Sequence, residues 1–228
     1  MMANRIIGLV GFIGSGKDSV ATKLVESGCV QESFAGPLKD VCASIFGWDR
    51  ELLEGQTDAS RDFRETTDLY WSKKLGINNF TPRLALQLIG TDVLRDHFNK
   101  EIWLSSLEYR IHKIRNDQKC VIISDCRFVN ELDFIKKLGG KVYHVIRGNI
   151  PEWYDFAVKA NTGEAKALHI MTTNYKHVHL SEWDWVGYEF DGVINNSGTL
   201  EDLDAEVTKI NTEYVATADT PHQKFDLI

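Results

Sequence analysis

A glycine-rich stretch between an apolar run and a helical pattern constrains this chain more than any other feature. Residues 11–19 read Gly-Phe-Ile-Gly-Ser-Gly-Lys-Asp-Ser and follow the apolar run at residues 5–10. The run predicts a buried β-strand, and residues 20–25 continue as a helix. In this context glycines let backbone N–H groups converge on a phosphate, while the helix N-terminus and Lys17 add positive charge. We therefore expect a phosphate-binding loop.

One position departs from the common form of such loops. The residue after the lysine is usually Ser or Thr, whose hydroxyl holds magnesium. Here that residue is Asp18, and Ser19 follows it. A chance glycine-rich turn is the alternative interpretation, but a strand before the loop and a helix after it favour phosphate binding.

The composition is that of a soluble globular protein. Of the 228 residues, 43% are hydrophobic and 26% are charged, and the formal net charge is −7. This balance argues against broad binding to nucleic acid or anionic membranes, because such surfaces need an excess of Lys and Arg. No apolar run approaches the ~20 residues of a membrane helix, and no signal peptide precedes the loop. We expect a cytoplasmic protein.

The four cysteines, Cys29, Cys42, Cys120 and Cys126, form no Cys-x-x-Cys pair and show no spacing typical of disulfides. We expect them to be free, buried thiols in a reducing cytosol.

Apolar strands alternate with helical patterns along most of the chain. Further strands are expected at residues 30–35, 119–124, 142–146 and 190–194. The alternation predicts an α/β fold, with a parallel sheet covered by helices on both faces, in a single domain over residues 1–228. Ligands of such sheets lie beyond the carboxyl ends of the strands. The phosphate loop, Asp125, Arg127 and Arg147 should therefore lie along one edge.

Three segments do not follow this alternation. Residues 47–80 are too long and irregular for a plain connection, so we expect an inserted subdomain or mobile flap there. Residues 149–188 have no clean period. The tail from residue 215 to 228 is polar, and we expect it to be loosely held.

Several side chains suit a phosphoryl-transfer site, which needs charge neutralisation and positioning more than covalent chemistry. Arg83, Gln87 and Thr91 recur at intervals of four on a helix that should begin at Thr81-Pro82. Asp125 suits either a magnesium ligand or a helix cap. The candidate cations are Lys39, Arg61, Arg64, Arg83, Arg127 and Arg147.

Together these features resemble the deoxynucleoside monophosphate kinases of tailed phages, within the P-loop nucleoside monophosphate kinase group. In that family, Gly-Lys-Asp followed by Ser or Thr looks like the usual form of the loop, which accounts for Asp18. The resemblance spans most of residues 5–214, and its motifs stand in order at residues 15–19, 35–40, 63–66, 83–92, 103, 125–131, 144–147, 179–182 and 193–198.

The resemblance implies that ATP and Mg²⁺ bind the loop and that the γ-phosphoryl group passes to the 5′-phosphate of a deoxynucleoside monophosphate. It implies that Lys17, Arg64, Arg83 and Arg127 are catalytic, and that either Asp18 or Ser19 is the magnesium ligand. The residues implied to hold ATP are Gly14, Ser15, Gly16, Lys17, Asp18, Ser19 and Arg147. Those implied to form the monophosphate site are Lys39, Arg64, Arg83, Gln87, Gly90, Thr91, Trp103, Asp125, Arg127 and Glu131.

The same resemblance implies a monophosphate-binding insertion at about residues 47–80 and a lid at about residues 149–182. This lid is longer and richer in Trp and His than is usual in the family. A homodimer, a small-molecule substrate and, for a phage-encoded protein, the host cytoplasm are also implied. The alternatives are another small-molecule P-loop kinase, similar to dephospho-coenzyme A kinase or phosphomevalonate kinase, and a nucleotide-binding module without catalysis.

Overall fold

The computed structural model describes residues 5–115 and 120–216 of the chain, which forms two compact units. The first unit contains residues 1–33 and 110–228, and the second contains residues 34–109. Of the tail expected to be loosely held, residues 217–228 lie outside the described residues.

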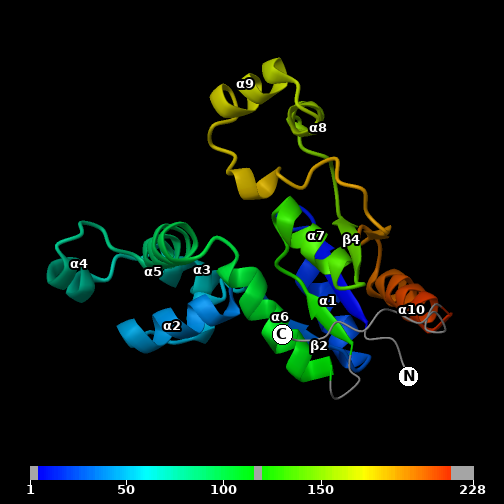
Figure 1. Ribbon diagram of the computed structural model, residues 1–228, viewed down its shortest axis with the longest axis horizontal. Coiled ribbons are helices and arrows are strands. Elements are labelled where there is room, and N and C mark those ends of the chain that lie inside the picture. The colour runs from blue at the N-terminus through cyan, green and yellow to red at the C-terminus, as the bar shows by residue number, and fades with distance from the viewer. Residues whose placement is uncertain (1–4, 116–119, 217–228) are drawn as a thin grey trace. The chain divides into compact units, whose positions relative to one another are not determined.

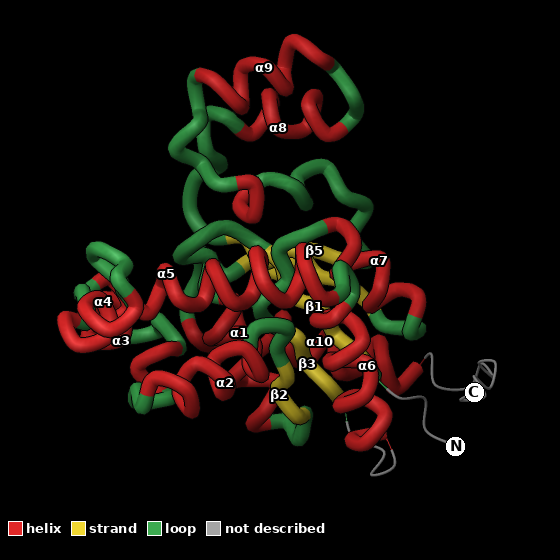
Figure 2. Tube along the Cα trace, turned by 60° about the vertical axis from the view of Figure 1, so that its left-hand side comes forward, coloured by secondary structure: helices red, strands yellow, loops and turns green. Residues whose placement is uncertain are grey.

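The first unit is built on a five-stranded sheet in the order β2-β3-β1-β4-β5. Every pair of neighbouring strands is parallel. The strands are the arrows in Figure 1 and the yellow segments in Figure 2. The predicted parallel sheet is confirmed, and the strand before the phosphate loop, β1, is its central strand. The strands are β1 (Ile6–Val10), β2 (Val30–Glu32), β3 (Val121–Ile123), β4 (Lys141–Ile146) and β5 (Gly192–Asn195).

One face of the sheet is covered by α1 (Lys17–Glu26) and α10 (Leu200–Ala216). Ile7 and Leu9 of β1 belong to the buried cluster on this face, together with Leu24 of α1. Because side chains alternate along a strand, the residues between them point to the opposite face.

The opposite face is covered by α7 (Val129–Lys137). A Cβ atom on Gly8 would lie 2.6 Å from Cδ1 of Ile135, and one on Gly140 would lie 2.8 Å from Cγ2 of the same side chain. These two glycines therefore allow α7 to approach the sheet closely. Helices on both faces of a parallel sheet confirm the predicted α/β fold class.

Two short helices follow the fourth strand, in the segment where the sequence has no clean period. α8 (Tyr154–Asn161) and α9 (Ala165–Thr173) pack against each other, and the 3₁₀ turn η3 (Leu180–Glu182) follows (Figure 1). Ala157 and Ala167 are among their few buried residues. Helices of about two turns with alanine at their contacts give only a weak periodic signal.

The second unit is helical and has its own aromatic core. Phe46 stacks on Trp48 with 4.4 Å between ring centroids, and its ring lies 5.4 Å from that of Phe80. The elements are α2 (Gly36–Phe46), η1 (Glu51–Leu53), α3 (Asp58–Glu65), α4 (Leu69–Leu75), α5 (Pro82–Gln87), the π-helical η2 (Leu88–Phe98) and the start of α6 (Ile102–Arg115).

Side-chain caps explain why the irregular stretch at residues 47–80 still forms helices. The Thr57 hydroxyl accepts a hydrogen bond from the Ser60 N–H, and Asp68 accepts one from the Trp71 N–H. The predicted cap at Thr81 is confirmed, since its hydroxyl accepts from the N–H group of the third helical residue. A capping hydrogen bond contributes about 1 kcal/mol, which matters for helices this short.

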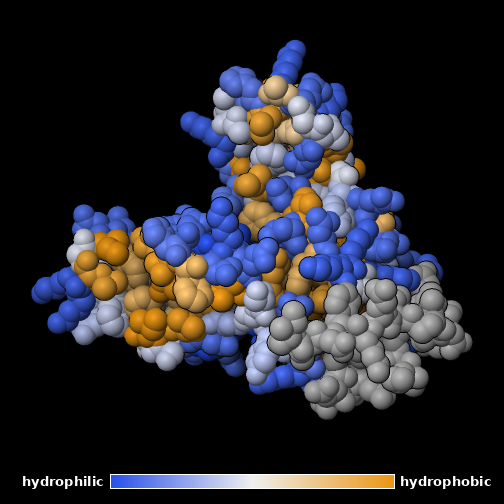
Figure 3. Space-filling view, in the orientation of Figure 1, coloured by the Kyte–Doolittle hydropathy of each residue, from blue (hydrophilic) through white to orange (hydrophobic). Residues whose placement is uncertain are grey.

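Apolar side chains also reach the surface of the second unit. Figure 3 shows apolar surface over the helices of this unit. Leu69 is 81% exposed, and Tyr70 and Ile45 are more than half exposed. Among the residues that the structure describes, no helix has the length and apolar character needed to cross a membrane.

The expectation of four free thiols is wrong for two of the cysteines. Cys29, which precedes β2, forms a disulfide with Cys120, which precedes β3, across 91 positions of the chain. The parallel pairing of β2 with β3 brings their Cα atoms within 4.4 Å, a proximity that sequence spacing does not reveal. Cys42 and Cys126 are free and buried.

Candidate functional site

The loop after β1 has the backbone shape that its glycines allow. Gly14 and Gly16 have φ angles of 81° and 83°, in the left-handed region that favours glycine. A Cβ atom on Gly11 would lie 2.4 Å from the carbonyl oxygen of Val145, and one on Gly16 would lie 2.0 Å from Nδ2 of Asn196. A side chain at Gly11 or Gly16 would therefore displace neighbouring atoms of the loop or its surroundings.

The first helix starts directly at the lysine of the loop. Gly16 is the N-cap of α1 and has no side chain with which to cap the first N–H groups. The Lys17 ammonium donates hydrogen bonds to the carbonyl oxygens of Gly11 at 2.7 Å and Phe12 at 3.1 Å. Burial and the positive charge of Arg127 lower the pKa of Lys17. This loop, cation and helix N-terminus form a site for an anion.

The residues of the loop fit a nucleotide phosphate chain with magnesium. The Ser15 hydroxyl is buried and has no hydrogen-bond partner among the described residues, so a phosphate oxygen would satisfy it. Asp18 and Ser19 are exposed in the first turn of α1. The described part of the chain contains no group of three or more His, Cys, Asp or Glu side chains suited to a metal. Magnesium commonly binds through one or two protein oxygens together with phosphates and water, which these two side chains suit.

Asn196 supports the phosphate loop, although it is not among the site residues predicted from the sequence. It follows β5, and its Nδ2 donates a hydrogen bond to the carbonyl oxygen of Ser15 at 3.0 Å. Its backbone N–H donates to the Ile146 carbonyl oxygen at 2.8 Å, which continues the pairing with β4. Its place just after a strand, at the edge where ligands bind, was a signal for its role.

The turn after β3 carries the second set of predicted residues. Glu131 is 4% exposed, and its Oε2 accepts hydrogen bonds from the backbone N–H groups of Arg127 at 2.8 Å and Phe128 at 3.2 Å. In this structure Glu131 thus caps the start of α7 and fixes the backbone of the turn. Burial, together with the charges of Glu131 and Asp125, raises the pKa of Cys126 well above its usual range.

The Arg127 side chain has a carboxylate partner outside its own turn. Its Nη1 lies 3.1 Å from Oε1 of Glu182, at the end of η3. The charges of these two side chains act in opposite directions on the pKa of Lys17, since Arg127 lowers it and Glu182 raises it. Arg147 is exposed just after β4.

An aromatic cluster joins the phosphate loop to the segment of α8 and η3. The Phe12 ring makes edge contacts with Trp153 at 5.4 Å and Tyr154 at 6.2 Å between centroids, and a tilted contact with Trp185 at 4.8 Å. His144 of β4 lies 5.0 Å from the Trp185 ring. The unusual tryptophan content of this segment therefore serves to pack it against the loop.

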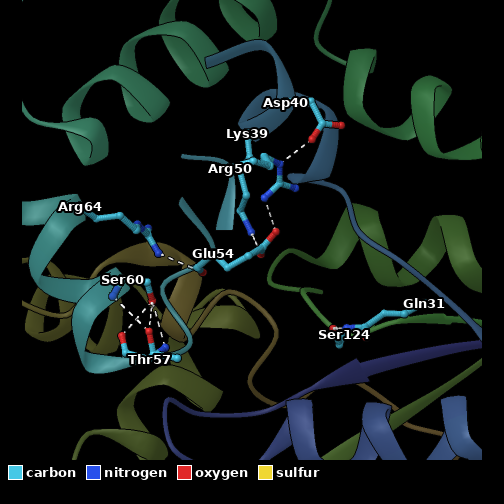
Figure 4. A network of polar contacts seen from close by, with 9 residues as sticks. All are labelled: Gln31, Lys39, Asp40, Arg50, Glu54, Thr57, Ser60, Arg64 and Ser124. Atoms are coloured by element: carbon cyan, nitrogen blue, oxygen red, sulfur yellow. Dashed lines mark hydrogen bonds and ion pairs between the residues drawn. The ribbon is translucent and has the colours of Figure 1, made fainter. Parts of the chain in front are cut away.

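In the second unit, Glu54 contacts two of the candidate cations, Lys39 and Arg64, and also Arg50 (Figure 4). Its carboxylate pairs with Lys39 and with Arg50, and its carbonyl oxygen accepts a hydrogen bond from Arg64 Nη1 at 3.4 Å. Burial alone would raise the pKa of Glu54, but hydrogen bonds from Lys39 and Arg50 outweigh it and lower the pKa. Sequence reasoning singled out Lys39 and Arg64 but missed Glu54.

The other predicted residues of this unit divide into two groups. The Trp103 indole N–H donates to the carbonyl oxygen of Gly90 at 3.1 Å, so these two lie together. Arg83, Gln87 and Thr91 are exposed, as a polar stripe requires. Arg83 pairs with Glu65 on the surface of the unit, and Arg61 pairs with Asp58 at 2.7 Å.

Comparison with known proteins identifies relatives of this chain. A family model described as deoxynucleotide monophosphate kinase matches residues 51–158. A protein of Acanthamoeba polyphaga mimivirus, named provisionally as a deoxynucleotide monophosphate kinase, is 35% identical over 183 residues, which cover 76% of this chain and 90% of that protein. The deoxynucleoside-5′-monophosphate kinase of Escherichia phage T5 is 27% identical over 181 residues, covering 58% of this chain and 72% of that enzyme.

Among solved structures, the dephospho-CoA kinase from Campylobacter jejuni aligns over 92% of this chain and 97% of its own. The TM-score of 0.44 and the identity of 15% are too low to carry an argument about function. The relationship to the mimivirus protein is much stronger, because it combines higher identity with nearly full coverage of that relative. On this similarity, the chain belongs to the deoxynucleotide monophosphate kinase family.

Proposed function

We propose that this protein transfers the γ-phosphoryl group of ATP to the 5′-phosphate of deoxynucleoside monophosphates and forms the diphosphates. The observation that carries this proposal is the similarity to the mimivirus relative, which extends over nine tenths of that protein. The glycine loop with Lys17 at the start of α1 supports it, because it supplies the donor half of a kinase site.

In this proposal the first unit holds the donor. Gly14, Ser15 and Gly16 present backbone N–H groups to the phosphate chain, and Lys17 neutralises charge on its β- and γ-phosphates. Magnesium, when bound, would neutralise further charge on these phosphates, with Asp18 or Ser19 as its protein ligand. Arg147 would contact the ATP base or the lid.

Three arginines serve the acceptor in this proposal. Arg64, Arg83 and Arg127 bind the acceptor phosphate and stabilise the charge that develops during transfer. No general base is needed, because the attacking phosphate oxygen is already anionic. The remaining residues proposed to contact the monophosphate or shape its site are Lys39, Gln87, Gly90, Thr91, Trp103, Asp125 and Glu131.

A panel of acceptors tests the proposal directly. Purified protein is incubated with ATP, Mg²⁺ and each deoxynucleoside monophosphate, and the diphosphate product is measured. Dephospho-coenzyme A and phosphomevalonate are included as the acceptors of the alternative kinases. The absence of diphosphate product from every deoxynucleotide would contradict the proposal, and phosphorylation of either other acceptor alone would replace it. Lys17→Ala, which removes the loop cation, should abolish turnover and leave the circular dichroism spectrum unchanged.

A further inference from the structure

Arg127 is fixed by two carboxylates that come from different elements. Glu131 of α7 accepts a hydrogen bond from the backbone N–H of Arg127 at 2.8 Å. Glu182 of η3 accepts one from the guanidinium Nη1 at 3.1 Å. The first contact sets where the side chain leaves the backbone, and the second sets where its charged end lies. The Arg127 side chain remains 51% exposed, so the other guanidinium N–H groups can reach a ligand.

Glu182 is itself held in place by the residues on either side of it. His179 is the N-cap of η3, and its Nδ1 accepts a hydrogen bond from the Ser181 N–H at 3.2 Å. On the other side, Asp184 Oδ2 accepts one from the Val129 N–H at the start of α7 at 2.8 Å. Glu182 therefore lies on a short element that is tied to the same helix that follows Arg127.

Further hydrogen bonds fix the backbone next to Glu182. The Asn161 side-chain amide at the end of α8 donates to the carbonyl oxygens of Trp183 and Val186, both at 2.8 Å. Trp183 and Val186 are buried. Because the backbone around Glu182 is held in this way, the Glu182 side chain can orient Arg127 with little loss of conformational entropy. A supporting residue of a binding site must meet this requirement.

We propose that Glu182 is a positioning residue, whose carboxylate holds the Arg127 guanidinium in the orientation that receives a phosphate group. The inference rests on the proposed function for the role of Arg127, but the Glu182–Arg127 contact itself does not. The two side chains have opposite effects on the pKa of Lys17: the Glu182 carboxylate raises it, and the Arg127 guanidinium lowers it.

Kinetics of single and double variants test the positioning role. We expect Glu182→Ala to raise KM for the monophosphate about tenfold, as loss of a charged hydrogen bond would, with less than a twofold change in KM for ATP. Glu182→Gln keeps an oxygen acceptor and should recover most of the loss. In an Arg127→Ala background, Glu182→Ala should cause no further loss, because its effect acts through Arg127. Asp133→Asn is the matched control: it weakens the Tyr188–Asp133 contact between the same segment and α7, and should leave both KM values unchanged.

Additive effects in the double variant, or an equal rise in both KM values, would overturn the proposal. So would a lower KM for the monophosphate in Glu182→Ala, because Glu182 would then compete with the phosphate. If the wild-type protein phosphorylates no deoxynucleotide, the proposed function fails, and a second measurement still decides on Glu182. In ¹⁵N-arginine spectra, the Arg127 side-chain signal, assigned by its loss in Arg127→Ala, should show restricted guanidinium rotation in the wild type and free rotation in Glu182→Ala. An unchanged signal would refute the role of Glu182.

Discussion

Asn196 holds the carbonyl oxygen of Ser15 through a hydrogen bond of 3.0 Å that joins positions 181 residues apart. One partner lies in the phosphate loop after β1, and the other follows β5, two strands away in the sheet. The conformation of the loop therefore depends on a residue from a distant part of the chain as well as on its own glycines.

Replacing Asn196 should weaken ATP binding. In Asn196→Ala the Ser15 carbonyl loses its donor, so the loop becomes less ordered and we expect KM for ATP to rise about fivefold. Steady-state kinetics with ATP as the varied substrate measure this effect. Asn195→Ala is the control, because that neighbouring side chain is exposed and accepts a hydrogen bond from the nearby Ser197 N–H. Equal effects of the two variants would mean that the Asn196 contact has no particular importance.

Two glycines of the loop should respond differently to alanine. Gly14 and Gly16 have almost the same φ, so each substitution carries a similar backbone strain of about 1 kcal/mol. Only at Gly16 would the new Cβ also collide with a side chain, at 2.0 Å from Asn196 Nδ2, whereas nothing lies within 4 Å of a Cβ at Gly14. We expect Gly16→Ala to lose at least tenfold more ATP affinity than Gly14→Ala in calorimetric titrations. Similar losses of ATP affinity in the two variants would show that backbone strain, and not the contact with Asn196, determines the effect.

Glu54→Gln should destabilise the second unit in a pH-dependent way. The pKa of Glu54 is lowered in the folded protein, so its ionised form adds stability that is present above its ordinary pKa and is lost as pH falls through the lowered value. Because the side chain is partly exposed, we expect a loss of about 1 kcal/mol at pH 7, and none in strong acid. Urea unfolding at several pH values measures it. Asp40→Asn, which removes a more exposed partner of Arg50, should have a smaller effect.

His144 should make the first unit sensitive to mild acid. Burial, followed by the charge of Lys17, lowers the pKa of His144 from an ordinary 6.5 to about 4. The unfolded chain therefore takes up a proton at a higher pH than the folded protein does. Stability should fall by roughly 2–3 kcal/mol as the pH decreases from 6.5 to 4, and then level off.

His144→Leu should remove this part of the pH dependence. The Nε2 atom of His144 is buried without a hydrogen-bond partner among the described residues, so an apolar side chain should be tolerated there. Thermal unfolding at pH 7 and pH 5 compares the two proteins. If the unfolding temperatures of the wild type and the variant fall by the same amount between pH 7 and pH 5, His144 is not the cause of the pH dependence.

The strands and the phosphate loop could be predicted because their signals are local. A buried apolar run, a glycine-rich turn and a helical period each lie within about ten residues, and alternation along the chain then implies parallel pairing. The segment with α8 and α9 lacks a clear hydrophobic period, because the residues at its helix contacts include alanines, which are common in both buried and exposed positions.

The missed residues depend on contacts between distant parts of the chain. Glu54, Glu182 and Asn196 are ordinary polar residues in sequence, and each acquires its role from a partner in another element. The Cys29–Cys120 disulfide is missed for the same reason, since it depends on two strands becoming neighbours. Charge and spacing identify candidate cations such as Lys39 and Arg127, but they do not identify the carboxylates that orient them.

Because Phe12 packs against Trp153 and Trp185, these two tryptophans are intrinsic fluorescence probes of the phosphate loop. Indole emission responds to the polarity and motion of its surroundings, and these two indoles touch a residue of the loop itself. Any change in the loop that moves the Phe12 ring alters the environment of both. The intrinsic fluorescence of the unlabelled protein can therefore follow nucleotide binding in real time, before any product has formed.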